Sequence, residues 1–214
     1  AYSGRLVSVV RQAGVELVPD SIKAVETTNN DGYWLIGEND SYFSREMIVC
    51  AGAWSGKLLK TLGYQLPLAN QRGFHVQFPE PNITLQRVVV LTDRKVFVTP
   101  MTAGLRAAGT VEITKLDSPV DMRRADALVG HVQQAWPDLE TQKYSSWSGE
   151  RPCLPDSLPI MGQSKEHPGL WFNFGHGHLG LTLSAAAGEE IANSMQSGKT
   201  GELIRAFNYD RFLK

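Results

Sequence analysis

The stretch GLWFNFGHGHLGLTLSAAAGEEIANSM, residues 169–195, decides the fold, because it joins an apolar strand to a helix through a glycine-spaced turn. The strand covers residues 169–174, and Gly175, Gly177 and Gly180 allow φ > 0 and leave room for a ligand beside the backbone. A buried helix is predicted from apolar residues at three- and four-residue steps, namely Ala185, Ala186, Ala187, Ile191, Ala192 and Met195. The start of such a helix presents unpaired N–H groups and a positive dipole end, which favours an anion or an electron-rich heterocycle.

Length and composition limit the class of protein. The 214 residues suit one large domain or two interleaved ones, and 42% hydrophobic residues are enough for a core. With 21 Lys+Arg against 22 Asp+Glu and no basic run, we expect no nucleic-acid partner. Cys50 and Cys153 suit free buried thiols in a reducing compartment. No transmembrane run or signal peptide is recognised, so we expect a cytoplasmic protein and leave peripheral attachment to the inner membrane open.

The first 65 residues are predicted to form a helix, a small β-meander, a buried strand and a second helix. The first helix runs through residues 5–10 and ends at Gly14, and because no lead-in precedes it we expect a fragment of a longer protein. The apolar run 47–51 is typical of a strand buried on both faces, and the second helix, residues 54–62, is closed by Gly63. The meander strands are expected at residues 15–18, 21–25, 33–36 and 42–43, with a hairpin turn at 29–32.

The middle of the chain changes to alternating strands, which predicts an antiparallel sheet. A helix over residues 120–136, stopped by Pro137, has one apolar side. A further strand is expected at residues 144–147, and residues 151–156 are expected to be a rigid, proline-braced loop. The sheet strands are predicted at residues 73–78, 87–91, 96–98 and 105–107.

Three segments together resemble the D-amino acid oxidase-type FAD-dependent oxidoreductases. They are GERPCLPDSLPIMG at residues 149–162, NFGHGHLG at residues 173–180 and the strand end CAGAWS at residues 50–55. Their order and spacing are similar to those of the C-terminal half of these enzymes, so the resemblance covers essentially the whole chain. Within the superfamily the chain most resembles the small subunit of D-amino acid dehydrogenase, and glycine and sarcosine oxidases are more distant cousins.

The resemblance implies a mixed α/β and α+β chain. Residues 1–65 and 150–214 would form a partial FAD-binding domain of the glutathione-reductase-like kind, and residues 66–149 an antiparallel-sheet substrate-binding domain. The family begins with a βαβ unit whose Gly-x-Gly-x-x-Gly turn holds the FAD pyrophosphate. Residues 175–180 match that spacing, but no such unit follows them, so we interpret them as the flavin-ring end of the site. Since the pyrophosphate cradle is lacking, we expect this fragment to bind FAD weakly or not at all.

The resemblance also assigns site residues. Arg151 matches the arginine that grips the substrate α-carboxylate, and its planar fork suits two parallel hydrogen bonds. Ile22, Ala51 and Gly52 match positions along the adenosine and ribose, and Gly149 is a further cofactor contact. Backbone groups facing the pyrimidine edge of the flavin are assigned to His176, His178, Leu179, Gly180, Leu181 and Thr182.

Simpler interpretations of these residues stay open. The turn can be structural, Arg151 can form a surface salt bridge, and Ala51 and Gly52 can be ordinary core residues. Metal binding by His176 and His178 is not favoured, because the chain has only five histidines and none of the others forms a ligand-like cluster with them, and we expect no metal.

Three further side chains receive structural expectations. Trp54 could flank the cofactor, but a tryptophan at a helix start is more often in the core, and we expect it there. Arg72 and His75 lie on the first strand of the predicted sheet, which would roof the substrate. Either could touch the substrate, but for both we expect a polar tip in water.

The activity implied by the resemblance is oxidation of a D-amino acid to an imino acid by hydride transfer, followed by hydrolysis to the 2-oxo acid. No catalytic acid, base or nucleophile is expected, since orientation and flavin electronics suffice. The partners would be a small amino acid and an electron acceptor such as a quinone, the latter left open. A glycine- or sarcosine-type amine oxidase is the close alternative. A non-catalytic, cofactor-free binding or interaction module is the alternative from another class.

Overall fold

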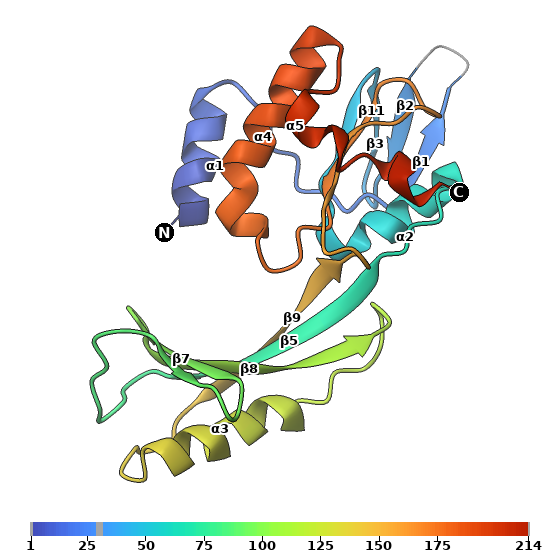
Figure 1. Cartoon of the computed structure of the whole chain (residues 1–214). Helices are drawn as coiled ribbons and strands as arrows, with labels where there is room; N and C mark the ends of the chain where they lie inside the picture. The colour runs from blue at the N-terminus through green and yellow to red at the C-terminus, as the bar shows by residue number, and fades with distance from the viewer. Residues whose placement is uncertain (1, 29–31, 214) are drawn as a thin grey trace.

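The computed structural model describes residues 2–28 and 32–213 and has an α/β part and a sheet part, joined by the long strands β5 and β9 (Figure 1). The elements are α1 (Tyr2–Gln12), β1 (Ala24–Thr27), β2 (Tyr33–Ile36), β3 (Ser41–Ser44), β4 (Met47–Val49), η1 (Gly52–Trp54), α2 (Ser55–Leu59), η2 (Lys60–Leu62), β5 (Ala69–Phe78), β6 (Val89–Leu91), β7 (Val96–Met101), β8 (Gly104–Thr114), α3 (Arg123–Ala135), β9 (Ser145–Cys153), β10 (Ile160–Gln163), β11 (Leu170–Phe174), α4 (Gly180–Ser197), α5 (Glu202–Arg205) and η3 (Tyr209–Phe212).

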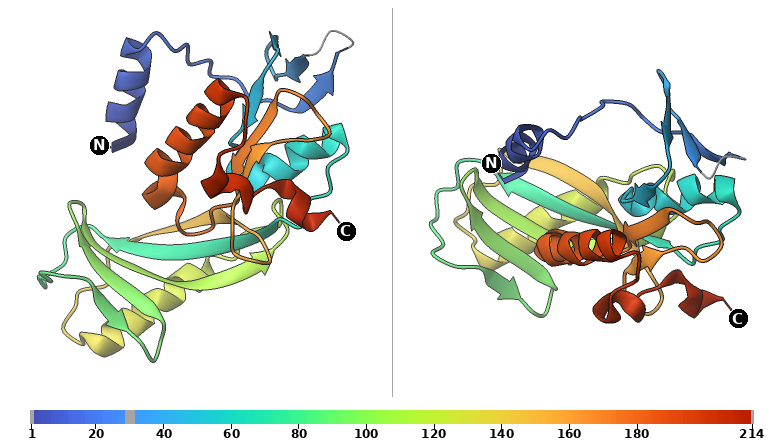
Figure 2. Two further views of the ribbon diagram at one scale, coloured as in Figure 1. Left: turned by 45° about the horizontal axis from the view of Figure 1, so that its top comes forward. Right: turned by 90° about the horizontal axis from the view of Figure 1, so that it is seen from above.

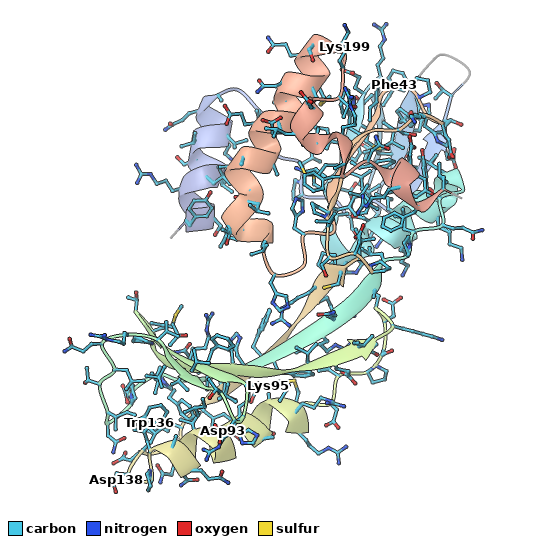
Figure 3. All side chains as sticks on the ribbon, viewed as in Figure 1. Phe43, Asp93, Lys95, Trp136, Asp138 and Lys199 are labelled. Atoms are coloured by element: carbon cyan, nitrogen blue, oxygen red, sulfur yellow. The ribbon has the colours of Figure 1, made fainter. Side chains whose placement is uncertain are left out.

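The sheet part is a five-stranded antiparallel sheet in the order β6-β7-β8-β5-β9, with α3 lying along one face (Figure 1). Alternate residues of β5 point to opposite faces. Phe74, Val76 and Phe78 are buried on the face that α3 covers, together with Leu128 and Val132 of the helix. Figure 3 shows the side chains between helix and sheet, with Trp136 directly after the helix on that side. We call this the closed face and the opposite one the open face.

The α/β part is built on a three-stranded sheet in the order β10-β11-β4. β10 and β11 are antiparallel, whereas β11 and β4 run parallel with Phe172 opposite Val49. One face of this sheet packs on the β1-β2-β3 meander, α2 and the C-terminal η3, and buries Tyr64, Leu170 and Tyr209. The other face packs against α4 and α5. The apolar runs thus place β4 and β11 side by side, although more than 100 residues separate them in the sequence.

Two helices leave apolar side chains in solvent. α1 stands away from the rest of the protein on an extended segment (Figure 2) and has no buried residue. The expected buried face of α4 is wrong in part, because Ala187 and Ile191 are buried whereas the neighbouring Ala185, Ala186 and Ala192 are exposed. Alanine spacing predicts a helix but not which of its faces meets a partner.

Most predicted elements are present, and the differences have local causes. Residues 15–18 form no strand. β4 is not buried on both faces, since Ile48 is 42% exposed at the edge of its sheet. The predicted rigid loop at residues 151–156 is wrong at its start, because β9 continues to Cys153 in register with β5. Most of the expected 29–32 turn lies outside the described residues.

Two expectations from composition are also resolved. Cys50 and Cys153 are free, but Cys50 is exposed and Cys153 half-buried, so the expected burial of both thiols is wrong. Among residues 2–28 and 32–213, no helix combines the length and the apolar character that a membrane crossing requires.

Candidate cofactor and substrate site

All predicted cofactor residues except Ile22 and Gly149 lie after the carboxyl ends of two adjacent parallel strands. Ala51 and Gly52 follow β4, and the turn beginning at Gly175 follows β11. Ligands of α/β sheets bind outside the carboxyl ends of the strands. The structure therefore brings together, at one edge of the sheet, two groups of residues that the sequence separates by more than 120 positions.

The turn after β11 is shaped by glycine. Gly175, Gly177 and Gly52 have positive φ values of 85°, 53° and 55°. A Cβ on Gly175 would lie 2.7 Å from Leu154 Cδ1, so only glycine fits there without a shift. The N–H of Gly177 donates to the carbonyl of Pro152 at 2.9 Å, which ties the turn to the end of β9. A cavity of about 350 Å³ lies here, lined by Gln71, Cys153, Leu154, Ser157, Gly175, His176, Gly177, His178 and Leu179.

His176 differs from His178 within this turn. Burial lowers the pKa of His176, so its imidazole is neutral near pH 7, and its Nε2 is buried without a hydrogen-bond partner. His178 is exposed. Among the described residues, no group of three His, Cys, Asp or Glu side chains is close enough to hold a metal ion.

The N-terminus of α4 is open. No side chain caps this 18-residue helix, and the first four N–H groups of a helix have no partner inside it. Leu179 and Leu181 beside this end are exposed, at 54% and 73% of their surface. The predicted backbone contacts at Gly180, Leu181 and Thr182 therefore lie in the first turn of α4, where the N–H groups have no partner within the helix and the dipole end is positive.

A second cavity, of about 510 Å³, contains the other predicted cofactor contacts. Ile22 and Ala51 line it, together with residues of β4 and α2. A methyl group on Gly52 would meet no atom within 4 Å, so the backbone there faces open space. Trp54 also lines this cavity and is 53% exposed, so its expected place in the core is wrong. Its position one turn beyond the end of β4 holds it at the rim.

Arg151 lies on β9 directly opposite Gln71 of β5. Residues opposite each other in an antiparallel pair share a face, so Arg151 is on the open face with Gln71, which lines the cavity of the turn. Its guanidinium lies against Gly73, where a Cβ would come within 1.9 Å of Nη1. That Nη1 is buried without a partner, and no ion pair of Arg151 occurs within the described ranges. A surface salt bridge is therefore not its role.

Gly149 has a packing reason to be glycine. It pairs with Gly73 across the strands, and a Cβ on Gly149 would lie 1.9 Å from Cη2 of Trp147. The indole of Trp147 stacks on the imidazole of His75, with ring centroids 4.9 Å apart and planes at 23°. The two glycines thus let Arg151 and Trp147 lie flat on the open face. Cofactor contact by Gly149 stays a prediction.

The expected solvation of Arg72 and His75 is wrong. Arg72 is 1% exposed on the closed face, where it donates to Glu150 at 2.8 Å, to Glu112 at 3.2 Å and to the carbonyls of Ser118 and Pro119. His75 is half-buried against Trp147, and burial together with the positive charge of Arg106 lowers the pKa of His75. Strand periodicity sets which face each residue takes but not what covers that face.

The structure thus places a glycine turn at the ends of parallel strands and, on the neighbouring sheet, an arginine whose Nη1 has no partner. A family model described as FAD dependent oxidoreductase matches residues 1–194. The chain belongs to this family. The resemblance carried by the three sequence segments is therefore confirmed, and so are the mixed fold and, at the level of the family, the oxidoreductase class and its FAD cofactor.

Two curated relatives are amino acid oxidases or dehydrogenases by name. The chain is 33% identical over 218 residues to a D-amino-acid oxidase of Bradyrhizobium diazoefficiens, covering 100% of the chain and 52% of the relative. It is 32% identical over 209 residues to a D-amino acid dehydrogenase of Granulibacter bethesdensis, covering 96% of the chain and 50% of the relative. The chain thus spans about half the length of the curated relatives it matches.

Solved structures support the fold alone. Glycine oxidase from Geobacillus kaustophilus superposes with a TM-score of 0.74 at 22% identity, covering 91% of this chain and 53% of that one. L-Amino acid deaminase from Proteus myxofaciens, solved with anthranilate, superposes with a TM-score of 0.78 at 19% identity, covering 98% and 59%.

The residues described above fit the flavin of FAD. The uncapped N-terminus of α4, the glycine turn with its buried free Nε2 of His176, and the open space before Gly52 are all polar or unobstructed and lie at the ends of β4 and β11. Contact of each predicted residue with FAD stays a prediction.

Sequence reasoning missed three residues of this region: Gln71, Trp147 and Arg106. Gln71 lines the cavity of the turn, and Trp147 and Arg106 belong to the open face. The alternation of β5 and β9 carries the signal for Gln71 and Trp147 once their register is known. Arg106 gives no such signal, because its unpartnered guanidinium appears only in the tertiary structure.

Proposed function

We propose that the protein containing this chain oxidises a D-amino acid to the imino acid, which water then converts to the 2-oxo acid and ammonia. The observation that carries the proposal is the buried, unpartnered Nη1 of Arg151 on the same face as Gln71, which lines the cavity of the glycine turn. A buried charged donor without a partner is costly, so a ligand that supplies an acceptor is favoured there. The curated relatives named D-amino-acid oxidase and D-amino acid dehydrogenase support the substrate class.

Arg151 would bind the α-carboxylate of the substrate. A guanidinium forms two parallel hydrogen bonds with a carboxylate, which fixes the orientation of the substrate as well as its position. Gly73 leaves room for the guanidinium to lie against the strand, because a Cβ there would meet it. A carboxylate held by two hydrogen bonds would fix the orientation of the Cα–H for hydride transfer.

FAD, when bound, supplies the two-electron acceptor for this oxidation. The free N–H groups at the start of α4 would stabilise negative charge that develops beside them, because they are preorganised and carry the positive dipole end. The neutral imidazole of His176 adds no charge of its own. No acid or base from this chain is needed, since the amine reacts in its neutral form and orientation provides the rate.

The proposal is tested with the full-length protein and a panel of D- and L-amino acids, glycine and sarcosine. Reduction of an artificial electron acceptor is measured with and without oxygen. Turnover of D-amino acids in preference to their L-enantiomers supports the proposal. Turnover of glycine or sarcosine alone would replace it with an amine oxidase, and a colourless protein that takes up no FAD would indicate a non-catalytic module.

The same measurements identify the electron acceptor. A rate that needs the artificial acceptor and does not change with oxygen indicates a dehydrogenase that passes electrons to a quinone or carrier. A rate that consumes oxygen and forms peroxide without the acceptor indicates an oxidase. Both outcomes leave the proposed D-amino acid oxidation intact.

A further inference from the structure

The two faces of the five-stranded sheet differ in charge. On the closed face, the carboxylates of Glu112 and Glu150 are bound by Arg72. The open face has two arginines, Arg106 and Arg151, and no acidic residue. Its positions, from the pairing register, are Phe97, Thr99 and Met101 of β7, Arg106, Ala108, Val111 and Ile113 of β8, Ala69, Gln71, Gly73, His75 and Gln77 of β5, and Ser145, Trp147, Gly149, Arg151 and Cys153 of β9.

Arg106 resembles Arg151 in lacking a partner. Its Nε is buried without a hydrogen bond, and it forms no ion pair within the described part of the chain. It lies opposite Gln77 of β5 and Thr99 of β7, and its charge reaches His75, which is on the same face. Two half-buried guanidinium groups on one acid-free face repel each other and lower the cost of placing two negative groups between them.

The two arginines lie on opposite sides of β5. Arg151 reaches Gly73 from β9, and Arg106 of β8 is opposite Gln77, four residues further along β5. A ligand held by both arginines therefore needs an anionic group at each of two ends. The stacked rings of His75 and Trp147 lie between the two ends and offer an apolar surface to the carbon chain.

We propose that Arg106 binds a second anionic group of the substrate, so that the preferred substrates are D-amino acids whose side chain ends in a carboxylate. The inference rests on the proposed function, in which Arg151 holds the α-carboxylate. His75 and Cys153 are the other titratable groups at the positions given above. Burial lowers the pKa of His75 and raises the pKa of Cys153, so both are neutral near pH 7 and the two arginines are the charges that a substrate meets.

The test compares D-glutamate with D-glutamine, which has the same shape without the charge, on the full-length holoprotein. We expect kcat/KM for D-glutamate to exceed that for D-glutamine by about tenfold or more, and Arg106→Gln to remove the preference by lowering the D-glutamate value by the same factor while the D-glutamine value changes little. Arg87→Gln is the matched control, because it removes the same charge from an exposed position before β6. Equal losses for both substrates in Arg106→Gln, or a preference for D-glutamine in the wild type, overturn the inference.

A binding measurement separates this inference from the proposed function. Glutarate and butyrate are titrated into the full-length holoprotein by calorimetry, without turnover. Tighter binding of glutarate that Arg106→Gln abolishes supports the second anion site even if no D-amino acid is oxidised. Equal affinities for the two acids overturn it, whereas oxidation of neutral D-amino acids alone would leave the proposed function standing.

Discussion

Arg72 and Arg151 lie in neighbouring residue pairs of β5 and β9, but they differ in whether the protein supplies hydrogen-bond partners for them. Arg72 of β5 is opposite Glu150, and Arg151 of β9 is opposite Gln71, one position along the ladder. Arg72 points to the closed face and is bound by Glu150, Glu112 and two carbonyls, whereas Arg151 points to the open face with Nη1 unpartnered. A buried charge that is paired within the protein can be kept there without a ligand. A buried charge without a partner is costly, which favours a ligand that supplies one.

The largest expected effect comes from breaking the closed-face network. Arg72→Met leaves Glu112 and Glu150 without their buried partner, so the free energy of unfolding should fall by about 3–5 kcal/mol. Urea unfolding of the full-length protein measures it. Replacing all three residues with Met, Gln and Gln should recover part of the loss, because no uncompensated charge remains. A stable Arg72→Met single variant would contradict the structural role of the network.

Substitution of Arg151 on the open face should lower activity but not stability. Arg151→Ala is expected to lower kcat/KM about 1000-fold, mainly through KM, because the bidentate hold on the carboxylate is lost. Arg151→Lys should restore little of it, since a lysine cannot form the planar fork. Thermal unfolding should change by less than for Arg72→Met. An unchanged KM would remove Arg151 from the carboxylate site.

Gly73 and Gly149 lie opposite each other beneath Arg151 and Trp147, and substituting each one separately tests how much each of these two side chains contributes. A methyl group at Gly73 would displace the guanidinium of Arg151, whereas one at Gly149 would displace the indole of Trp147. We expect Gly73→Ala to lower kcat/KM about 100-fold, because small displacements of a positioning group are costly, and Gly149→Ala to lower it less. Steady-state kinetics measures both variants. Equal losses would show that Trp147 matters as much as Arg151.

The smallest expected effect is on stability and comes from Asp20, whose carboxylate accepts hydrogen bonds from backbone N–H groups and from Tyr42. Asp20 is partly desolvated, which raises its pKa, but hydrogen bonds from the hydroxyl of Tyr42 and the N–H groups of Ser21, Asn39 and Asp40 lower that pKa to about 2. Because the folded pKa lies below the ordinary value, the stability that it contributes is present above about pH 4 and is lost as the pH falls toward about 2.

Asp20→Asn tests this contribution. The variant should have a lower Tm than the wild type at pH 7, and the difference should shrink between about pH 4 and about pH 2 as Asp20 of the wild type gains its proton. Thermal unfolding across this range measures it. A Tm difference that stays constant with pH would show that the charge of Asp20 contributes nothing to stability.

Much of the fold follows from local pattern. The strand at residues 170–174, the helix after Gly180 and the α3 helix ended by Pro137 are present because apolar spacing, glycine and proline act within a few residues. The predictions that failed concern what lies across space. Residues 15–18 found no strand partner, Ile48 has no covering layer, and β9 continued past Arg151 because β5 supplied a partner.

The division of residues into domains at 1–65, 66–149 and 150–214 stays a prediction. One buried cluster gathers the antiparallel sheet and α3, and the other two gather the α/β elements. β9 runs without interruption across the predicted boundary between residues 149 and 150. A single boundary in the sequence therefore cuts a strand that the two parts share.

The sequence by itself determined the family, the cofactor class and the turn from residue 175 to residue 180, because glycines and a helix start leave a signature within a short stretch. Only the tertiary structure decided that the ends of β4 and β11 meet and that Arg72 is satisfied while Arg151 and Arg106 are not. The physical reason is that hydrogen bonding and burial depend on which strand lies alongside. That pairing joins residues far apart in the chain, and no single stretch of sequence records it.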